Sequence, residues 1–563
     1  MPEKKEMTME TRLLLAFLLM GLVLFGTQYF YKPAPPPPAA NAAKPGPERQ
    51  ADHSKAAQAP APPAAASTAP AEMPGQVHAD SEETFAVETS KYRVTFSNRG
   101  AVVKSWILKE YKDHKDQPLN LVNQSAAGKI PAPFSLSFKN QAPPGDPNNA
   151  LFRTARSPDG LGVDFEFSDG RSVTKKSFKF GSESYLVSVT TQVTDNGILV
   201  PHSIAWRGGF GDETVVNAAS EQRAVYYDLA NSKLFEKDPK EAKNGPVSFS
   251  GQFSFAGLED KYFAGVFLPQ GRGPVEITIF SDAVQNAAGS AEQRVGAAVG
   301  GDGLNAFSFF VGPKDNDLLK KVDPKLTQLI DWGWFEILAK PLFLVLNWTA
   351  DHIVHNWGWA IILVTVVINL LLFPLRLSSL KASRKMQRLQ PQIQAINAKY
   401  KNISMRDPRK AEQNQEMMDL YKREGVNPMG GCVPMLIQLP FLYAFYKVLS
   451  ISIEMRGAPW LWVHDLSQPE TIAIRVLPLI LIGTQFLTQK MTPQPGVDPS
   501  QQKMMMIMPL FLGYIFWFLS SGLVLYYLTG NLVGIALQWL TNKTMPPAPA
   551  APVAVERPPK KKR

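Results

Sequence analysis

Residues 425–441 read GVNPMGGCVPMLIQLPF, a turn-forming segment that passes directly into an apolar run. This run continues to about residue 449, and similar runs occupy about 357–375, 472–489, 504–519 and 522–541. None of the five runs contains Asp or Glu. An apolar run of about 18 residues with almost no charge is typical of a membrane-spanning helix. The sequence therefore predicts a five-helix membrane domain near its C-terminal end.

The bulk composition excludes several classes of protein. The chain has 563 residues, which is long enough for two or three domains, and a formal net charge of +10. Cys432 is the single cysteine, so the chain has no intrachain disulfide and no multi-cysteine metal site. The excess of basic residues favours either nucleic acid or an anionic membrane surface. Its position beside the apolar runs favours the membrane, and we expect no DNA partner.

The N-terminal segment, residues 1–31, predicts a membrane anchor. Lys4, Lys5 and Arg12 precede an apolar run from Leu13 to about Tyr31. A cleaved signal peptide is the main alternative, but the run is long and lacks a small-x-small cleavage site. We therefore expect a retained span with its N-terminus in the cytoplasm. Residues 32–84 are rich in Pro and Ala and predict a solvated linker.

Residues 85–312 alternate between apolar and polar side chains, a period of two that is typical of strands with one buried face. Segments such as 168–170 and 195–197 contain Asn, Asp and Gly and separate these stretches as turns. Many short strands with one apolar face predict an all-β antiparallel sandwich. One preceding span places this domain in the periplasm.

Residues 313–356 are expected to form an amphipathic helix on the outer membrane surface. The apolar core, residues 342–348, is too short to span a bilayer, and Lys340, Pro341 and Asp351 bound it. Tryptophans at 332, 334, 348 and 357 suit the headgroup zone.

The distribution of charge predicts the topology. Residues 376–428 contain 12 Lys/Arg and 5 Asp/Glu, net 12 − 5 = +7, and the tail 542–563 contains 6 and 1, net 6 − 1 = +5. Residues 450–471 have 1 and 3, net 1 − 3 = −2. Because positive loops stay in the cytoplasm, we expect six transmembrane helices with both termini cytoplasmic.

The loop 376–428 predicts a cytoplasmic helical hairpin. Apolar residues recur at steps of three and four from Met386 to Tyr400, and Asp407-Pro408 provides the start of a second helix. The hairpin is either a solvated structural element or a docking platform for acidic lipid, ribosomal RNA or a nascent chain. The candidate docking residues are Lys399, Lys401, Arg406, Arg409 and Lys410.

The apolar runs contain neutral polar residues but no catalytic set. The chain has no His-Glu-x-x-His motif and no phosphate-binding Gly-rich loop. We therefore expect no catalytic residue, no metal, no cofactor and no enzymatic activity. Thr365 and Asn369 lie four residues apart on one helix face, and Arg376 follows two turns later. These polar groups serve either interhelical hydrogen bonds or a polar groove, and their number favours the groove.

Several motifs resemble those of YidC-type membrane protein insertases. They are QEMMDLYK (415–422), VNPMGGC (426–432), PMLIQLP (434–440), WVHDL (462–466) and SGLVLYY (521–527). The resemblance covers about residues 325–541. The anchor and the large β-rich domain look like the Gram-negative form, with a looser match of residues.

The resemblance implies an insertase and foldase that inserts, folds and helps assemble inner-membrane proteins, alone or with the Sec translocon. It implies a hydrophilic groove that is open to the cytoplasm and to lipid and closed on the outside. The implied partners are nascent membrane proteins, the Sec translocon, the ribosome and anionic lipids. Two alternatives from other classes are a small-solute channel or facilitator, and an envelope scaffold with a ligand-binding β-domain.

One residue departs from the family pattern. The family usually has an arginine four residues after the threonine that Thr365 matches, and this chain has Asn369 there. Arg376 is the candidate substitute at the mouth of the groove, and Asn369→Arg is expected to be tolerated. The candidate groove residues are Thr365, Asn369, Arg376, Gln438, Leu439, Leu442, Tyr526 and Tyr527.

Overall fold

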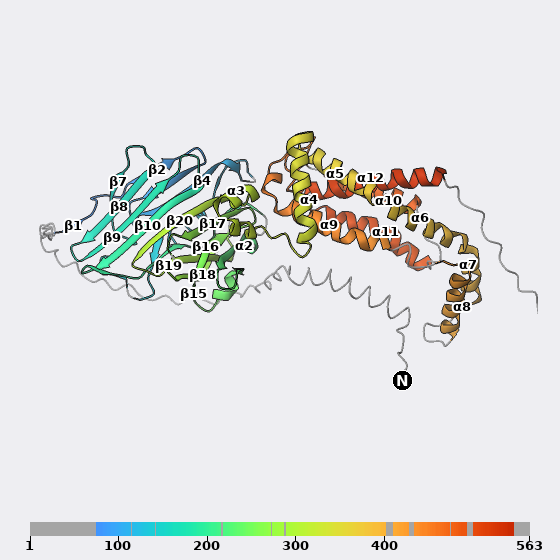
Figure 1. The fold of residues 1–563 in the computed structure, drawn as a ribbon, viewed down its shortest axis with the longest axis horizontal. Helices are drawn as coiled ribbons and strands as arrows, with labels where there is room; N and C mark the ends of the chain where they lie inside the picture. Colours follow the sequence, from blue (N-terminus) through green and yellow to red (C-terminus); the bar gives the residue numbers. More distant parts are fainter. Residues whose placement is uncertain are drawn as a thin grey trace, which may run out of the picture. The chain divides into compact units, whose positions relative to one another are not determined.

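The computed structural model describes residues 75–113, 115–140, 142–215, 218–271, 273–285, 289–400, 409–426, 433–472, 474–491 and 499–544. These residues belong to one compact unit, Ala71–Arg563, whose elements are labelled in Figure 1. The expected anchor at 1–31, most of the linker 32–84 and most of the tail 542–563 lie outside the described residues.

The first half of the described chain consists mainly of β-strands, here called the β-domain. The strands are β1 (Gln76–Val77), β2 (Thr84–Glu88), β3 (Tyr92–Ser97), β4 (Val102–Lys112), β5 (Pro118–Asn120), β6 (Ser135–Ser137), β7 (Arg153–Arg156), β8 (Gly162–Asp169), β9 (Ser172–Phe180), β10 (Leu186–Asp195), β11 (Ile198–Leu199), β12 (Ser203–Trp206), β13 (Arg223–Asp228), β14 (Lys233–Lys237), β15 (Val247–Gly251), β16 (Phe253–Glu259), β17 (Phe263–Pro269), β18 (Val275–Gln285), β19 (Ala291–Gly300) and β20 (Leu304–Pro313). Short helices η1 (Gln124–Ala126), α2 (Ala218–Glu221) and η2 (Pro239–Ala242) connect them.

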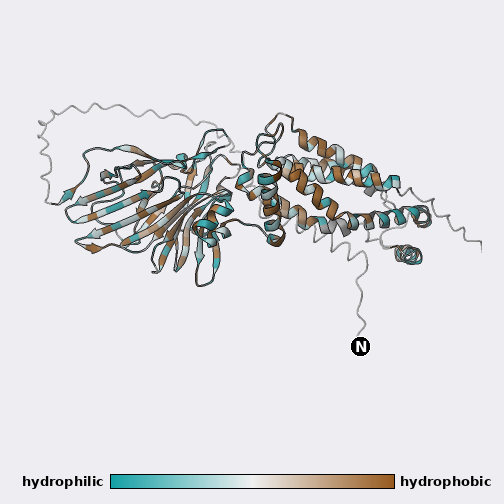
Figure 2. Cartoon of the chain, turned by 45° about the horizontal axis from the view of Figure 1, so that its top comes forward, coloured by the Kyte–Doolittle hydropathy of each residue, from teal (hydrophilic) through white to brown (hydrophobic). Residues whose placement is uncertain are grey.

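The strands form three antiparallel sheets. The largest has the order β1-β8-β9-β10-β20-β17-β16-β13-β14, with β7 added to β8 and β11 to β10. The second has the order β15-β18-β19-β12-β6, and the third β2-β3-β4-β5. Figure 2 shows hydrophobic and hydrophilic residues alternating along many of these strands. This alternation is the pattern from which the sequence predicted a β-rich domain.

Turn chemistry fixes the register of the hairpins. Between β10 and β11, Asn196 and Gly197 both have positive φ, at 48° and 77°. A two-residue turn with both central residues in this region matches the twist of an antiparallel pair. Asp195 therefore pairs with Ile198 and Thr194 with Leu199, as the Asp-Asn-Gly signal predicts.

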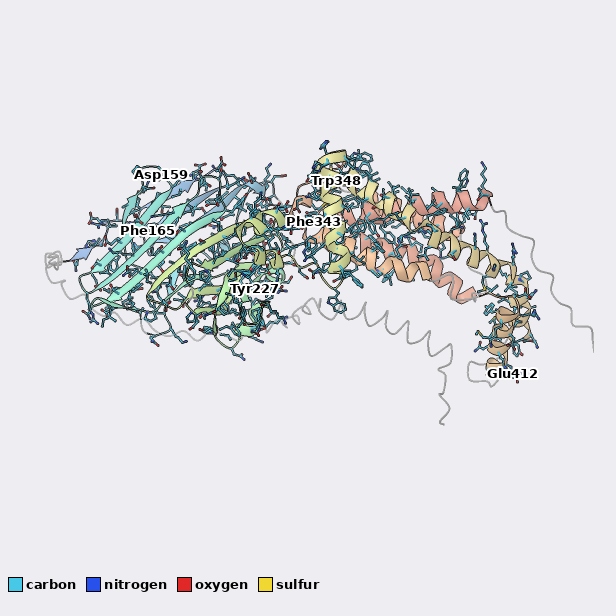
Figure 3. The ribbon with its side chains drawn as sticks, viewed as in Figure 1. Asp159, Phe165, Tyr227, Phe343, Trp348 and Glu412 are labelled. Atoms are coloured by element: carbon cyan, nitrogen blue, oxygen red, sulfur yellow. The ribbon has the colours of Figure 1, made fainter. Side chains whose placement is uncertain are left out.

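Aromatic side chains fill the space between the sheets. Phe96 of β3 lies 5.0 Å from Phe178 of β9, so the four-stranded sheet packs on the large sheet. Trp206 of β12 lies 6.1 Å from Phe309 of β20, so the five-stranded sheet packs on it as well. Figure 3 marks Phe165 on β8, which points into the same core. Aromatic pairs at these distances add to the stability that burial alone provides.

The connector after β20 contains several short helices instead of the single helix predicted for 313–356. They are α3 (Asn316–Val322), η3 (Pro324–Leu329), α4 (Glu336–Thr349) and the π-helical turn η4 (Ala350–Val354). Pro324 begins η3 after the cap Asp323, which ends α3. In α4, Phe343 is buried and Trp348 is 55% exposed (Figure 3), so the helix has one packed and one open face.

The remaining elements are helices, here called the helical domain. They are α5 (Trp357–Leu371), α6 (Phe373–Arg388), α7 (Gln390–Lys399), α8 (Arg409–Arg423), α9 (Val433–Ile451), η6 (Ile453–Met455), α10 (Val476–Met491), α11 (Pro499–Phe516) and α12 (Ser521–Thr544). The helices α7 and α8 bury a small cluster of their own, which includes Leu389, Ile393 and Leu420. The stripe predicted from Met386 onward therefore packs against α8.

Two described stretches are long and apolar enough to cross a membrane by length and composition, Glu336–Val354 and Ser521–Thr544. The apolar helices Trp357–Leu371 and Met506–Phe516 are shorter. The apolar core at residues 342–348 is part of a longer apolar helix. The helix α4 runs through Pro341 and passes into η4 at Ala350, so the apolar stretch is longer than residues 342–348.

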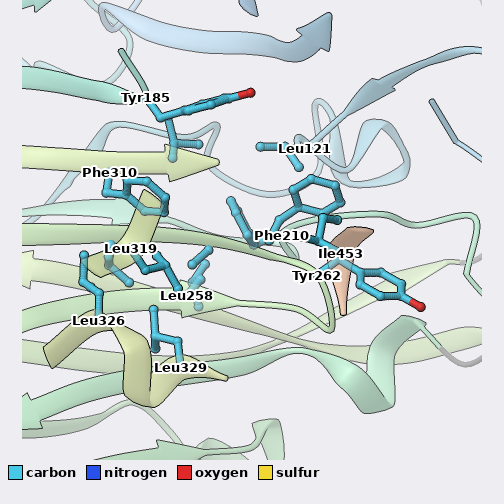
Figure 4. Packing of buried hydrophobic residues seen from close by; sticks show 14 of the residues in the cluster. Leu121, Tyr185, Phe210, Leu258, Tyr262, Phe310, Leu319, Leu326, Leu329 and Ile453 are labelled. Atoms are coloured by element: carbon cyan, nitrogen blue, oxygen red, sulfur yellow. The ribbon is translucent and has the colours of Figure 1, made fainter. Parts of the chain in front are cut away.

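The loop after α9 packs into the hydrophobic core of the β-domain. Ile453 of η6 is buried in the same cluster as Phe210 and Tyr262, and Figure 4 shows it beside these two rings. Arg456 forms an ion pair with Asp212, and the exposed fractions of these side chains are 5% and 0%. The helical domain and the β-domain therefore share a continuous core at this loop.

Candidate functional site

The site begins on α5, which is anchored at its first residue. Asn356 caps the helix, because its side-chain oxygen accepts hydrogen bonds from the backbone N–H groups of Gly358 and Trp359 at 3.0 and 3.2 Å. Its amide nitrogen donates to the carbonyl of Pro459 at 2.9 Å. The cap therefore ties the start of α5 to the loop that follows η6.

Thr365 and Asn369 form a polar column on one face of α5. The Thr365 hydroxyl is fully buried and donates to the carbonyl of Ile361 at 2.5 Å. The Asn369 amide nitrogen donates to the carbonyl of Thr365 at 2.8 Å. With its nitrogen engaged, Asn369 directs its side-chain oxygen away from Thr365.

Arg376 of α6 reaches back to this column. Its Nη1 donates to the Asn369 side-chain oxygen at 3.2 Å. Long side chains on a helix point toward its N-terminus, so an arginine seven residues later spans the two turns between them. The structure thus brings together three residues that the sequence singled out, with the cation beside the asparagine.

Arg376 brings a positive charge to this column. Within the described residues, no salt bridge involves Arg376, and the five apolar runs contain no Asp or Glu. A guanidinium has five N–H donors. Among the described residues, the neutral amide of Asn369 accepts one of them.

The other predicted groove residues lie on α9 and α12. Gln438 and Leu442 are half-buried, and Leu439 is 43% exposed. Tyr526 is buried, and its ring stacks on Phe445 with centroids 3.9 Å apart. Tyr526 thus packs between α9 and α12.

Tyr527 is half-buried and packs on Phe516 with centroids 4.8 Å apart. One polar contact escaped the sequence analysis. Asn531 donates to Thr484 of α10 at 3.5 Å. Thr484 was a detectable signal, because it is a hydroxyl within an otherwise apolar run.

The predicted docking residues are only partly described. Lys399 forms an ion pair with Glu416 at 2.7 Å, and this hydrogen bond raises the pKa of the lysine. Arg409 is exposed at the start of α8, close in sequence to Glu412, which Figure 3 labels. Lys401 and Arg406 lie outside the described residues, as does the side chain of Lys410.

Arg456, in the loop after α9, entered the sequence prediction only through its charge. Besides its ion pair with Asp212, Arg456 donates to the carbonyl of Lys112 at 2.7 Å. Its guanidinium also lies 5.4 Å from the ring of Tyr262 and 5.5 Å from that of Phe263. The sequence feature that pointed to Arg456 is that it is the single Lys or Arg in the loop 450–471, which has a net charge of −2.

No group of three or more His, Cys, Asp or Glu side chains that could hold a metal ion occurs among the described residues. The polar groups at the predicted groove positions are the guanidinium of Arg376, the amides of Asn369 and Gln438, and the hydroxyls of Thr365, Tyr526 and Tyr527.

Comparisons with known proteins assign the chain to a family. The YidC periplasmic domain profile matches residues 84–345, and the 60Kd inner membrane protein profile matches residues 348–548. The membrane protein insertase YidC of Ralstonia nicotianae is 32% identical over 537 residues, which cover 92% of this chain and 93% of that protein. The protein of the same name from Geobacter metallireducens is 33% identical over 576 residues, covering 96% and 100%.

A solved structure described as an active YidC insertase with its first transmembrane domain resolved is 21% identical. It covers 82% of this chain and 94% of its own, with a TM-score of 0.36. The family profiles together match most of the sequence, and the two relatives match nearly all of it. The chain therefore belongs to the YidC family of membrane protein insertases.

Proposed function

We propose that this protein inserts integral proteins into the inner membrane and assists their folding and assembly, alone or with the Sec translocon. The observation that carries the proposal is the polar column of Thr365, Asn369 and Arg376 within an apolar helical domain. Family membership supports the same function. No covalent chemistry is needed, because insertion is a transfer between water and lipid.

The column lowers the cost of moving a polar flank across the membrane. A charged side chain at the bilayer centre costs about 2.5–3.5 kcal/mol or more. A hydrated amide and a guanidinium within the helical domain replace part of the lost hydration. An acidic flank gains further, because Arg376 offers charge-assisted hydrogen bonds. The substrate's apolar segment then leaves sideways into lipid.

A groove closed at its outer end fits the residues better than a channel. The first two turns of α5 bury Gly358, Ala360, Ile361 and Val364, and a Cβ at Gly358 would lie 2.2 Å from the ring of Trp460. This outer end is apolar and tightly packed, whereas the polar groups begin at Thr365. A solute pore needs polar lining through both leaflets.

The proposed topology and partners follow from charge. We assign six transmembrane helices: one at 1–31 and five in 357–541, with the β-domain at 85–312 in the periplasm. Segment 313–356 lies at the outer membrane surface. The hairpin 376–428 and the tail 542–563 are cytoplasmic, because both are strongly basic. The hairpin then meets ribosomes and anionic lipids, and the groove meets nascent membrane proteins.

The decisive experiment measures insertion of one single-span substrate in cells that depend on this protein. The substrate carries a neutral, acidic or basic translocated flank, and insertion is scored by protease accessibility. Asn369→Leu is expected to lower insertion of the acidic-flank substrate about tenfold, the equivalent of roughly 1.4 kcal/mol. The matched control is Asn531→Leu, which removes an amide that bonds Thr484 instead. Equal insertion of all three substrates by Asn369→Leu and the parent would reject the groove.

A further inference from the structure

A pair of glycines on α12 faces the polar column. Gly530 and Gly534 lie one helical turn apart and therefore on one face. A Cβ added to Gly530 would meet the Asn369 amide nitrogen at 3.9 Å, and one added to Gly534 would meet the Arg376 guanidinium. The two glycines thus lie opposite the two polar side chains in the same order.

The space at Gly534 is filled by the guanidinium itself. A Cβ there would lie 3.1 Å from Nη2, 3.2 Å from Nη1 and 3.3 Å from Cζ of Arg376. These distances are shorter than ordinary van der Waals contact, which begins near 3.5 Å. An alanine would force the guanidinium to move by a few tenths of an ångström. The corresponding contact at Gly530 is an ordinary one and would force nothing.

The bond that holds Arg376 has little room for such a shift. Its length to Asn369 is 3.2 Å, the upper end of the range for an N–H···O hydrogen bond. Asn369 is itself held by its bond to the Thr365 carbonyl, so its oxygen does not follow the arginine. A displacement of a few tenths of an ångström away from Asn369 therefore breaks the contact.

We propose that Gly534 is a positioning residue: its missing side chain seats the Arg376 guanidinium against Asn369 and thereby fixes where the groove carries its positive charge. This inference rests on the proposed function. It assigns to α12 a role in selecting substrates with acidic flanks, a role that the helix performs through Arg376 without touching the substrate.

The test compares Gly→Ala variants by the insertion assay with acidic and neutral flanks. Gly534→Ala is expected to lower the acidic-to-neutral insertion ratio about two- to tenfold, the range for one net hydrogen bond. Gly530→Ala and Gly483→Ala are matched controls, and a Cβ at Gly483 meets nothing within 4 Å. Alanine is the better helix former, so all three variants are expected to fold.

A second background separates positioning from packing. In Arg376→Gln, the further change Gly534→Ala is expected to leave the acidic-to-neutral ratio unchanged, because no guanidinium remains to displace. If Gly534→Ala lowers insertion of both substrates equally in both backgrounds, the glycine serves helix packing and the proposal is wrong. If it matches Gly530→Ala in the parent background, the proposal is likewise wrong. Neither result contradicts the insertase function. That function would be rejected only if the substrates were inserted equally well in cells that lack this protein.

Discussion

Lys176 in the β-domain is buried, Arg376 in the helical domain is half-buried, and the two basic side chains have different sets of partners. The Lys176 ammonium is 1% exposed and donates to the carbonyls of Gly100, Ala101 and Phe134 at 2.7, 3.2 and 2.7 Å. An ammonium has three donors, so all of them are used. Arg376 has five donors and one amide acceptor among the described residues.

The difference indicates what each charge does. Full satisfaction makes Lys176 a structural tie that joins β9 to the turn after β3 and to the segment before β6. Arg376, with one amide acceptor among the described residues, is the cation that we propose to contact polar flanks of substrates. The loop residue Arg456 is intermediate: Asp212 and the carbonyl of Lys112 accept from its Nη2 and two rings lie nearby, but its Nη1 is buried without a hydrogen-bond partner among the described residues. Buried cations therefore stabilise the β-domain and its contact with the loop after α9, whereas we propose that Arg376 acts on substrate.

The largest effect is expected from removing the satisfied cation. Lys176→Met leaves three buried carbonyls without a donor, and the expected loss of stability is roughly 3–5 kcal/mol. Hydrogen exchange of the β9 and β10 amides in the full-length protein measures it. Lys179→Met, on the exposed face of the same strand, is the matched control. If the β9 and β10 amides exchange at the same rates in both variants, Lys176 does not hold these segments together.

The buried, neutral side chain of His202 makes the stability of the β-domain depend on pH. Burial lowers the pKa of His202 from 6.5 to about 4. Its ring donates from Nδ1 to the carbonyl of Val200 at 2.9 Å, and Nε2 accepts from the Thr191 hydroxyl at 2.8 Å.

Below pH 6.5 the His202 ring binds a proton in the unfolded chain but stays neutral in the folded protein. The β-domain therefore loses up to about 3 kcal/mol as pH falls from 6.5 to 4, and His202 contributes no further slope below that. Comparing His202→Gln with the parent across this range isolates the effect. If stability depended on pH in the same way in both proteins, the pKa of His202 would be the same in the folded and unfolded states.

Arg456 tests whether the loop depends on its ion pair. Arg456→Gln removes the cation from a carboxylate with 0% side-chain exposure, and we expect roughly 2–3 kcal/mol of local destabilisation. Faster hydrogen exchange should appear at residues 452–463 and at 208–214 together. Arg171→Gln, which breaks the exposed ion pair with Asp195 at 2.8 Å, is the control and should change little. Faster exchange in the loop alone would show that Arg456 orders only its own segment.

The sequence predicted the strands better than it predicted these contacts. Alternation places Val163 and Phe165 on one face of β8 because a strand's period is fixed by its backbone. The meeting of Arg376 and Asn369 depends instead on a side-chain rotamer and on the space at Gly534, which is distant in sequence. Arg456 escaped notice for the same reason, since its partner Asp212 belongs to another domain. The segment 313–356, predicted as a helix, is divided at Asp323 and Pro324, where α3 ends and η3 begins.

The structure also revises one expectation about the groove. The sequence predicted that Asn369→Arg is tolerated, but Arg376 already occupies the space beside residue 369. Two guanidinium groups there repel each other, so Asn369→Arg is expected to lower insertion of acidic-flank substrates about tenfold. Adding Arg376→Gln should restore it, because one cation then replaces the other. Failure of the double variant to recover would mean that the charge must come from α6.

The smallest effect concerns the hairpin, where the partnered charge is exposed. Lys399 and Glu416 form an ion pair with exposed fractions of 58% and 39%, so its contribution to stability is below about 1 kcal/mol. Lys399→Gln and Glu416→Gln break the same pair but change the net charge in opposite directions. If the hairpin docks by electrostatics, the first weakens and the second strengthens co-sedimentation of the detergent-solubilised protein with ribosomes. Each change should alter the slope of binding against salt by roughly 1. If both variants weaken binding equally, the hairpin docks through its shape. The charges of Lys399 and Glu416 then do not determine ribosome binding.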